Sequence, residues 1–158
     1  MVWNIIYGII AFVILAFVGM MLIPSTRKGG ASIEIQASAE QILTVLQDVK
    51  NQPNWRKDIK AIEMKDGGWT EVTTNNVKTD FRWVSVASQK VELSYASNAG
   101  YTGTWIATLT PSATGTRMDV IEQVTIRNPI SRLISRIFFD PDAFSRSYLE
   151  QLKGKVEQ

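Results

Sequence analysis

The chain has 158 residues, a formal net charge of +2, and neither cysteine nor histidine. These absences exclude a disulfide framework, a thiol nucleophile, a zinc–thiolate site, a Ser-His-Asp triad and any histidine-based metal site. So small a net charge gives no argument for nucleic acid as a partner, and no metal or cofactor is expected.

The N-terminal residues 2–23 form an apolar run without a charged side chain, closed by Pro24. About 20 helical residues cross the roughly 30 Å hydrocarbon core of a bilayer. We therefore expect residues 1–24 to be a transmembrane anchor, with a cleaved signal peptide or a buried core helix as alternatives. Arg27 and Lys28 follow the run and no basic residue precedes it. This asymmetry predicts a single-pass membrane protein with its soluble domain on the cytoplasmic side.

The residues after the apolar run indicate a short linker and then one domain. Residues 25–30 end in two glycines and are expected to be flexible, and residues 31–158 suffice for a single core. Alternating polar and apolar residues predict a strand over 32–36. Ser38, with Gln41 three residues later, forms a capping box that predicts a helix directly after this strand.

The rest of the domain shows strand patterns and then a helical one. Asn128-Pro129 begins the helical pattern, and Asp140-Pro141 is expected to break it. Its apolar stripe, which includes Leu133, Ile137, Phe144, Tyr148 and Leu152, is expected to be mostly core. Turn signals separate six alternating runs, which predict an antiparallel meander over residues 59–64, 69–74, 79–87, 90–96, 101–110 and 116–126. The fold class is therefore α+β, with a curved sheet whose apolar face is covered by a C-terminal helix.

Several short stretches also resemble a known family. They are the alternating strand and capped helix of residues 33–40, the run ending in Asp at 45–48, and the Pro-Asn-Trp of 53–55. Over residues 31–157 the chain resembles the START-like helix-grip (SRPBCC) superfamily, in its polyketide cyclase/dehydrase and lipid-transport branch. It departs from the family pattern with Ala39, where proline is usual. The resemblance implies a seven-stranded antiparallel sheet wrapped around a long C-terminal helix, with a cavity for an apolar ligand between them.

Glu122 is the candidate with the most chemical interest, because it interrupts an apolar row on one face of the last strand. It is either a strand-end or edge residue paired with an arginine or solvent, a ligand contact, or a general acid or base with a raised pKa. Arg82 is a candidate for a ligand carboxylate or phosphate, or else an exposed residue paired with Asp80 or Glu92. The other ligand-binding candidates are Trp83, Tyr95, Tyr101, Trp105, Phe144 and Tyr148. Core packing is the alternative for the three tyrosines and for Phe144.

Three functions are compatible with these observations. The first is a membrane-tethered binding module for a lipid-like or other hydrophobic small molecule, with the bilayer and the ligand as partners. The second is a cyclase/dehydratase-type enzyme in which Glu122 or a tyrosine transfers a proton. The third is a protein-interaction domain with no open cavity. Basic residues also gather in the last segment, either as a solvated face or against an anionic bilayer; they are Arg127, Arg132, Arg136, Arg146, Lys153 and Lys155.

Overall fold

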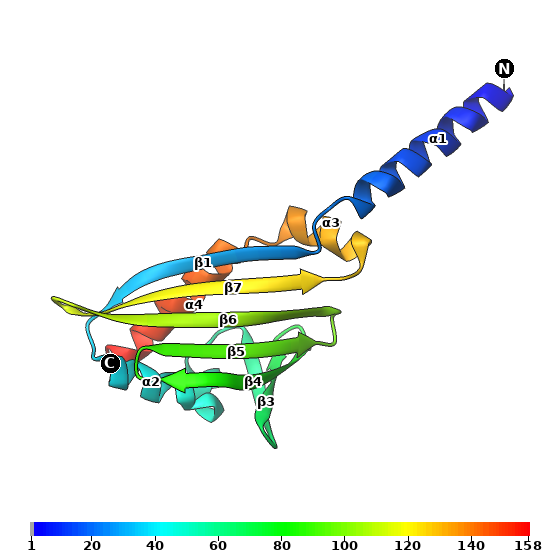
Figure 1. Cartoon of the computed structure of the whole chain (residues 1–158). Helices are drawn as coiled ribbons and strands as arrows, with labels where there is room; N and C mark the ends of the chain where they lie inside the picture. The colour runs from blue at the N-terminus through cyan, green and yellow to red at the C-terminus, as the bar shows by residue number, and fades with distance from the viewer. Residues whose placement is uncertain (1) are drawn as a thin grey trace.

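A computed structural model describes residues 2–158 (Figure 1). Within this range the seven strands form one antiparallel sheet in the order β1-β7-β6-β5-β4-β3-β2. The elements in chain order are α1 (Val2–Met21), β1 (Thr26–Ile35), α2 (Ala39–Gln47), the 3₁₀ helix η1 (Val49–Asn54), β2 (Ile59–Lys65), β3 (Gly68–Thr73), β4 (Lys78–Ala87), β5 (Lys90–Ser97), β6 (Tyr101–Ser112), β7 (Gly115–Ile126), α3 (Pro129–Phe138) and α4 (Pro141–Val156).

This α+β architecture confirms the expected seven-stranded sheet with C-terminal helical cover. The bounds of β2 to β7 lie within two residues of the expected ones, because side-chain alternation and turn residues are local signals. The capping box at the start of α2 is also present: the Ser38 hydroxyl accepts from the Gln41 amide, and the Gln41 side chain accepts from the Ser38 amide.

The expected flexible linker over residues 25–30 is wrong, because β1 already begins at Thr26 and pairs with β7 from there. The two glycines of this segment serve close packing. A Cβ at Gly29 would collide with Pro141 of α4, and a Cβ at Gly30 would collide with the backbone of β7. The strand therefore depends on tertiary contacts that its own sequence does not reveal.

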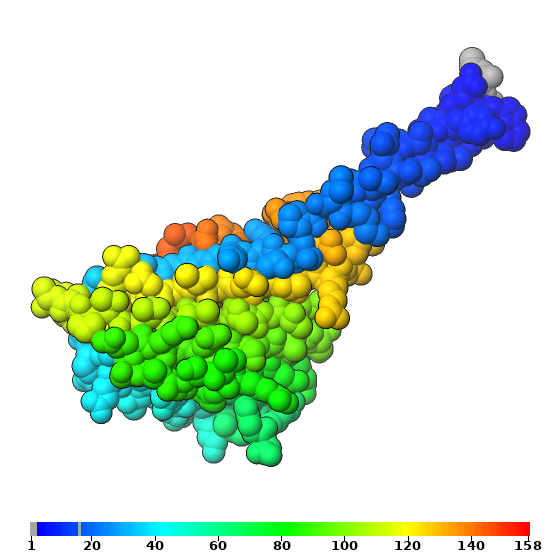
Figure 2. All heavy atoms as spheres, viewed as in Figure 1, coloured from blue at the N-terminus to red at the C-terminus, as the bar shows by residue number. Residues whose placement is uncertain are grey.

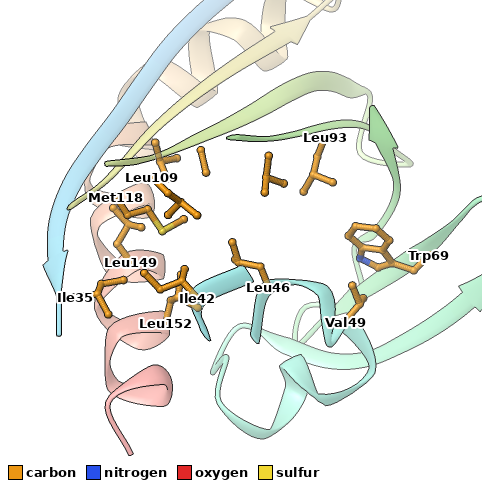
Figure 3. Close-up of a cluster of buried hydrophobic side chains, with 13 residues drawn as sticks. Ile35, Ile42, Leu46, Val49, Trp69, Leu93, Leu109, Met118, Leu149 and Leu152 are labelled. Carbon is orange, nitrogen blue, oxygen red and sulfur yellow. The ribbon is translucent and has the colours of Figure 1, made fainter. Parts of the chain in front are cut away.

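The core lies between the inner face of the sheet and the helices α2 and α4 (Figure 3). Ile42 and Leu46 of α2 and Leu149 and Leu152 of α4 are buried there. Strand residues complete the cluster, among them Ile35, Leu109 and Met118. Each buried side chain of this size contributes about 1.5–3 kcal/mol relative to an exposed one.

The C-terminal helical segment is divided as expected at Asp140-Pro141. Asp140 caps α4 by accepting from the amides of Asp142 and Ala143, and Asn128 caps α3 in the same way. Of these two C-terminal helices, only α4 contributes buried residues to the core. The expectation that the apolar stripe continues as core through Leu133 and Ile137 is wrong, because both side chains are exposed on α3, a helix that buries no residue.

The N-terminal helix α1 projects from the domain as a stalk (Figure 2). None of the span Trp3–Met21 is buried, and this span is long and apolar enough to cross a membrane. The alternative of a buried core helix is therefore wrong.

Candidate functional site

A cavity of about 530 Å³ lies between the inner face of the sheet, η1 and α4. Small-molecule sites in proteins commonly occupy about 300–1,000 Å³ and have mostly apolar walls. Aromatic rings form much of the wall here, and they contact one another in series. Trp69 stacks on Phe81 with ring centroids 5.4 Å apart, Phe81 contacts Tyr95 at 5.3 Å, and Tyr95 meets Tyr101 edge-on at 6.2 Å. The wall is therefore largely fixed by its own packing.

Most of the candidate residues meet in this cavity. Its lining includes Trp83, Tyr95, Tyr101, Trp105, Glu122, Phe144 and Tyr148. Their role as ligand contacts stays a prediction. Arg82 does not line the cavity, because successive side chains of a strand point to opposite faces and Arg82 lies on the exposed outer face of β4. Its proposed role as a cavity residue that binds an anionic group is wrong.

Glu122 and Tyr95 form a buried polar pair in the cavity wall. The Tyr95 hydroxyl donates to Glu122 Oε1 over 2.6 Å, and Glu122 is only 9% exposed. Burial raises the pKa of Glu122, although the hydrogen bond from Tyr95 and the charge of Arg56 oppose this shift. Burial and the neighbouring Glu122 also raise the pKa of Tyr95. The pair can hold or donate a proton inside an apolar cavity.

This pairing removes one of the three interpretations of Glu122. The residue lies on β7, an interior strand between β1 and β6, and its partner is a tyrosine rather than an arginine or solvent. Glu122 is therefore not an edge residue. Ligand contact and proton transfer remain as its two functional interpretations.

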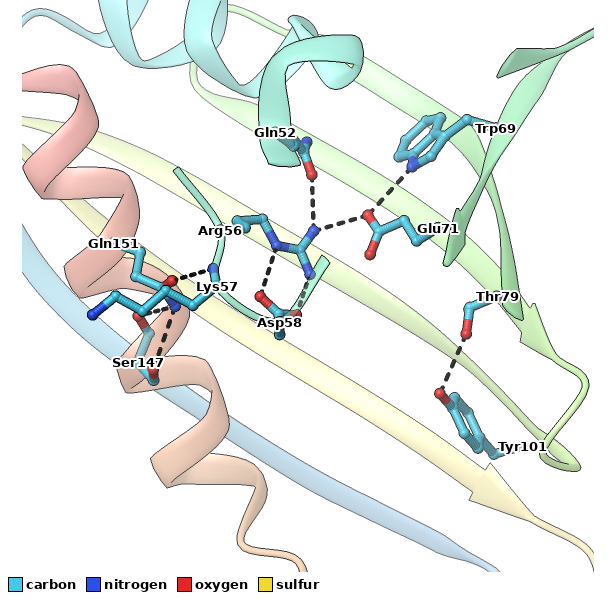
Figure 4. Close-up of polar contacts among 10 residues, drawn as sticks. All are labelled: Gln52, Arg56, Lys57, Asp58, Trp69, Glu71, Thr79, Tyr101, Ser147 and Gln151. Carbon is cyan, nitrogen blue, oxygen red and sulfur yellow. Dashed lines mark hydrogen bonds and ion pairs between the residues drawn. The ribbon is translucent and has the colours of Figure 1, made fainter. Parts of the chain in front are cut away.

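A second buried polar group centres on Arg56, which follows η1 (Figure 4). Its Nη1 donates to Glu71 Oε1 over 2.9 Å and to Gln52 Oε1 over 2.8 Å, and its Nη2 donates to Asp58 Oδ2 over 2.8 Å. Burial alone would lower the pKa of Arg56, but Glu71 and Asp58 more than offset this effect and raise it. The guanidinium carbon also lies 5.3 Å from the centroid of the Tyr148 ring, a cation–π distance. The cavity wall thus contains a permanent positive charge on Arg56, whose guanidinium already donates hydrogen bonds to three protein side chains.

Sequence reasoning missed several polar residues that line the cavity, among them Glu71, Arg56 and Ser145. Glu71 had a signal, since it shares a strand face with the apolar Trp69. Arg56 lies between η1 and β2, outside any helix or strand, so no periodic pattern of apolar residues predicts that it is buried. Ser145 of α4 is also buried, and its hydroxyl is the one buried side-chain polar atom without a hydrogen-bond partner in the described part of the chain. It is a free donor and acceptor in the cavity wall.

Among residues 2–158, no three carboxylates gather in an arrangement that could hold a metal ion. The chemistry that the cavity offers comes from its apolar wall, the Glu122–Tyr95 pair and the unpartnered Ser145 hydroxyl.

The family model described as "Polyketide cyclase / dehydrase and lipid transport" matches residues 27–157, nearly the whole chain after the stalk. The chain belongs to this family. Membership confirms the resemblance seen in the sequence, and it is consistent with hydrophobic ligand binding or cyclase-type chemistry as the general class of function. No curated protein matches the chain.

Solved structures share the fold of this family member at low sequence identity. A START superfamily protein from Mycobacterium smegmatis aligns with a TM-score of 0.60 and 13% identity, over 83% of this chain and 97% of the other. A norcoclaurine synthase point mutant from Thalictrum flavum, in complex with a transition-state analogue, aligns with a TM-score of 0.66 and 13% identity, over 83% and 94%. A conserved protein from Geobacillus kaustophilus aligns with a TM-score of 0.66 and 11% identity, over 82% and 95%. Sequence identities this low show that the fold is shared, but they do not identify the ligand.

Proposed function

We propose that the protein binds a lipid-like or other hydrophobic small molecule in the cavity between the sheet and α4. The observation that carries this proposal is the cavity of about 530 Å³ between the sheet and α4, whose wall is largely aromatic. Removing apolar ligand surface from water yields about 25 cal/mol per Å², so a cavity that encloses such a ligand supplies the main driving force. The third hypothesis, a domain without an open cavity, is contradicted by the same observation.

Polar groups in the wall fix the orientation of the ligand. The Ser145 hydroxyl has no protein partner, so a hydrogen bond to a ligand would satisfy a buried group that is otherwise orphaned. The Tyr101 hydroxyl lies 3.3 Å from Thr79 Oγ1 and keeps capacity for a second bond. A ligand with one polar end and an apolar body fits this distribution.

Tethering by α1 is the second part of the proposal. A membrane anchor keeps the cavity beside ligands dissolved in the bilayer and raises their effective concentration. The exposed apolar stalk supports it, and the basic Arg27 and Lys28 after the stalk support a cytoplasmic position of the domain.

Ligand binding is tested by placing a tryptophan side chain on each face of β7, once inside the cavity and once outside it. Val124 lines the cavity, whereas Ile121 lies on the outer face of the same strand. The full-length variants Val124→Trp and Ile121→Trp are compared for binding of a naphthylamine fluorophore and for apolar molecules that co-purify, identified by mass spectrometry. Loss of binding in Val124→Trp alone is expected. Equal binding by both variants, with unfolding midpoints showing both to be folded, would refute the cavity as the binding site.

A proton-transfer enzyme of the cyclase/dehydratase type is the second candidate, favoured by the raised pKa of Glu122 and its hydrogen bond from Tyr95. The variant Glu122→Gln separates the two functions. It keeps the shape of the cavity, so a binding module retains its ligand, whereas an enzyme that uses this carboxyl binds the ligand and no longer converts it.

A further inference from the structure

The short helix α3 is amphipathic, but its apolar side faces outward and its polar side faces the domain. Its apolar residues occupy one side, and this side is exposed: Ile137 is 64% and Phe138 is 81% exposed. Ile130, Leu133 and Ile134 complete the exposed apolar side. A helix on the surface of a soluble domain ordinarily turns such a stripe toward the core. Here the domain is contacted by the polar side instead.

Hydrogen bonds hold α3 in this orientation. Arg132, on the polar side, donates through Nε to the Ile126 carbonyl over 2.8 Å and through Nη2 to the Arg127 carbonyl over 2.6 Å. Ser135 of the same side lines the cavity. A rotation that buried the apolar stripe would break these bonds, so the exposure of the stripe is fixed by the fold.

The same contacts join α3 to the end of the stalk. Arg132 Nη1 donates to the carbonyl of Ile23, two residues after α1, over 3.0 Å. Arg27 Nη1 donates in turn to the carbonyls of Ser135 and Phe139 over 2.9 Å and 3.1 Å, at the C-terminal end of α3. Cations are favourable at that end of a helix. The exposed apolar side of α3 is thus bound to the point where α1 leaves the domain.

We propose that the apolar side of α3 lies in the headgroup region of the bilayer that α1 crosses. The inference rests on the tether of the proposed function, since a spanning α1 brings Ile23 to the membrane surface and α3 with it. Helices with one apolar and one polar face commonly lie in this plane. Charge supports a lipid partner as well, because Arg127, just before the helix, and Arg136, in its last turn, are exposed and would face anionic headgroups.

This position would set the mouth of the cavity against the membrane. Ser135 and Phe139 line the cavity beside α3, and Ile126 lines it at the end of β7. Phe139 and Phe144 are in contact, with ring centroids 5.7 Å apart, and both remain partly exposed. The cavity therefore reaches the surface next to α3, and an apolar ligand could pass between bilayer and cavity with little exposure to water.

The test measures depth in the membrane with single cysteines, which is simple because the chain has none of its own. The full-length variants Leu15→Cys, Ile137→Cys and Val84→Cys are spin-labelled and reconstituted in vesicles of phosphatidylcholine and phosphatidylglycerol. Collision rates with oxygen, which concentrates in lipid, and with a water-soluble nickel chelate are then compared. Leu15 reports α1, and Val84, 56% exposed on the outer face of β4, is the matched aqueous control for Ile137.

We expect the labels at Leu15 and Ile137 to collide with oxygen several-fold more than with nickel, relative to the label at Val84. A lipid-buried Leu15 with a nickel-accessible Ile137 would overturn the inference and leave the tether intact. Shielding of Ile137 from both reagents would overturn it in favour of a protein contact, such as a second copy of the chain. Nickel access at Leu15 would overturn the tether itself, and with it the inference.

Discussion

Gly103 on β6 lies opposite Tyr95 on β5, and the space that its missing side chain leaves is occupied by the Tyr95 phenol. A Cβ at position 103 would collide with the ring and the hydroxyl of Tyr95 and with the backbone carbonyl of Gln123 on β7. The gap lets the hydroxyl reach across β6 to Glu122 on β7. The polar pair of the cavity thus depends on a residue that itself has no functional group.

Gly103→Ala is therefore expected to displace the phenol and to break the Tyr95–Glu122 hydrogen bond. The added methyl group overpacks the site, which should lower the free energy of unfolding by about 1–3 kcal/mol in denaturant titrations. Gly154→Ala is the matched control, because a Cβ there meets nothing within 4 Å and the residue lies in α4. It should raise stability by about 0.4–1 kcal/mol. Equal effects of the two changes would contradict the role of Gly103.

Glu122 should make stability depend on pH. Its pKa is raised above the 4.5 of the unfolded chain, chiefly by burial, so the folded state holds a proton that the unfolded state releases. Its stabilising contribution is complete below pH 4.5 and is lost as the pH rises through the folded-state pKa. Glu122→Gln, which cannot titrate, should therefore gain stability relative to the wild type as the pH rises through that window.

The measurement is the difference in free energy of unfolding between Glu122→Gln and wild type from pH 4 to pH 8. Taking the difference removes the contributions of carboxyls with lowered pKa, such as Asp119. A difference that stays constant over this range would mean that the Glu122 pKa is not raised by folding.

The Arg56 group should be sensitive to the loss of one partner. Arg56→Met leaves Glu71 buried without its cation, and breaking a buried pair in this way typically costs about 3–5 kcal/mol. Lys65→Met removes the exposed pair with Asp80 and should cost less than about 1 kcal/mol. Adding Glu71→Gln to Arg56→Met should recover part of the loss. Denaturant titration of the wild type, the two single variants and the double variant measures their free energies of unfolding. A double variant no more stable than Arg56→Met would count against the Arg56–Glu71 pair.

The role of α1 is checked by fractionation of cells that make the full-length protein. An anchored chain stays with the membranes after alkaline carbonate extraction and retains its N-terminal residues, as read by intact-mass measurement. A chain that lacks residues 1–24 and is released would identify the segment as a cleaved signal peptide.

The sheet was predictable because alternation and turns are local, and the same alternation brought Tyr95, Trp105 and Glu122 to one face. β1 was misjudged because Gly29 and Gly30 indicate flexibility in isolation, whereas contacts with β7 and α4 make them strand residues. Arg56 was missed for a related reason: it has no periodic neighbours, and its burial follows from Glu71 and Gln52, which come together only in the folded chain.

The stripe of α3 shows a different limit of sequence reasoning. Helical spacing correctly identified one apolar side, but spacing does not say what that side faces. The deciding information lies in Arg132, whose bonds to Ile126 and Ile23 turn the polar side inward. Such long-range contacts leave no periodic trace in the chain.

Only residues 22–25 separate α1 from β1, and fully extended they span no more than about 14 Å. If α1 is a membrane anchor as proposed, this short connection keeps the domain at the membrane surface. The domain could exchange cargo with its own leaflet or with proteins diffusing in that leaflet, but a shuttle across the cytosol would require the receiving membrane to approach within the thickness of the domain itself.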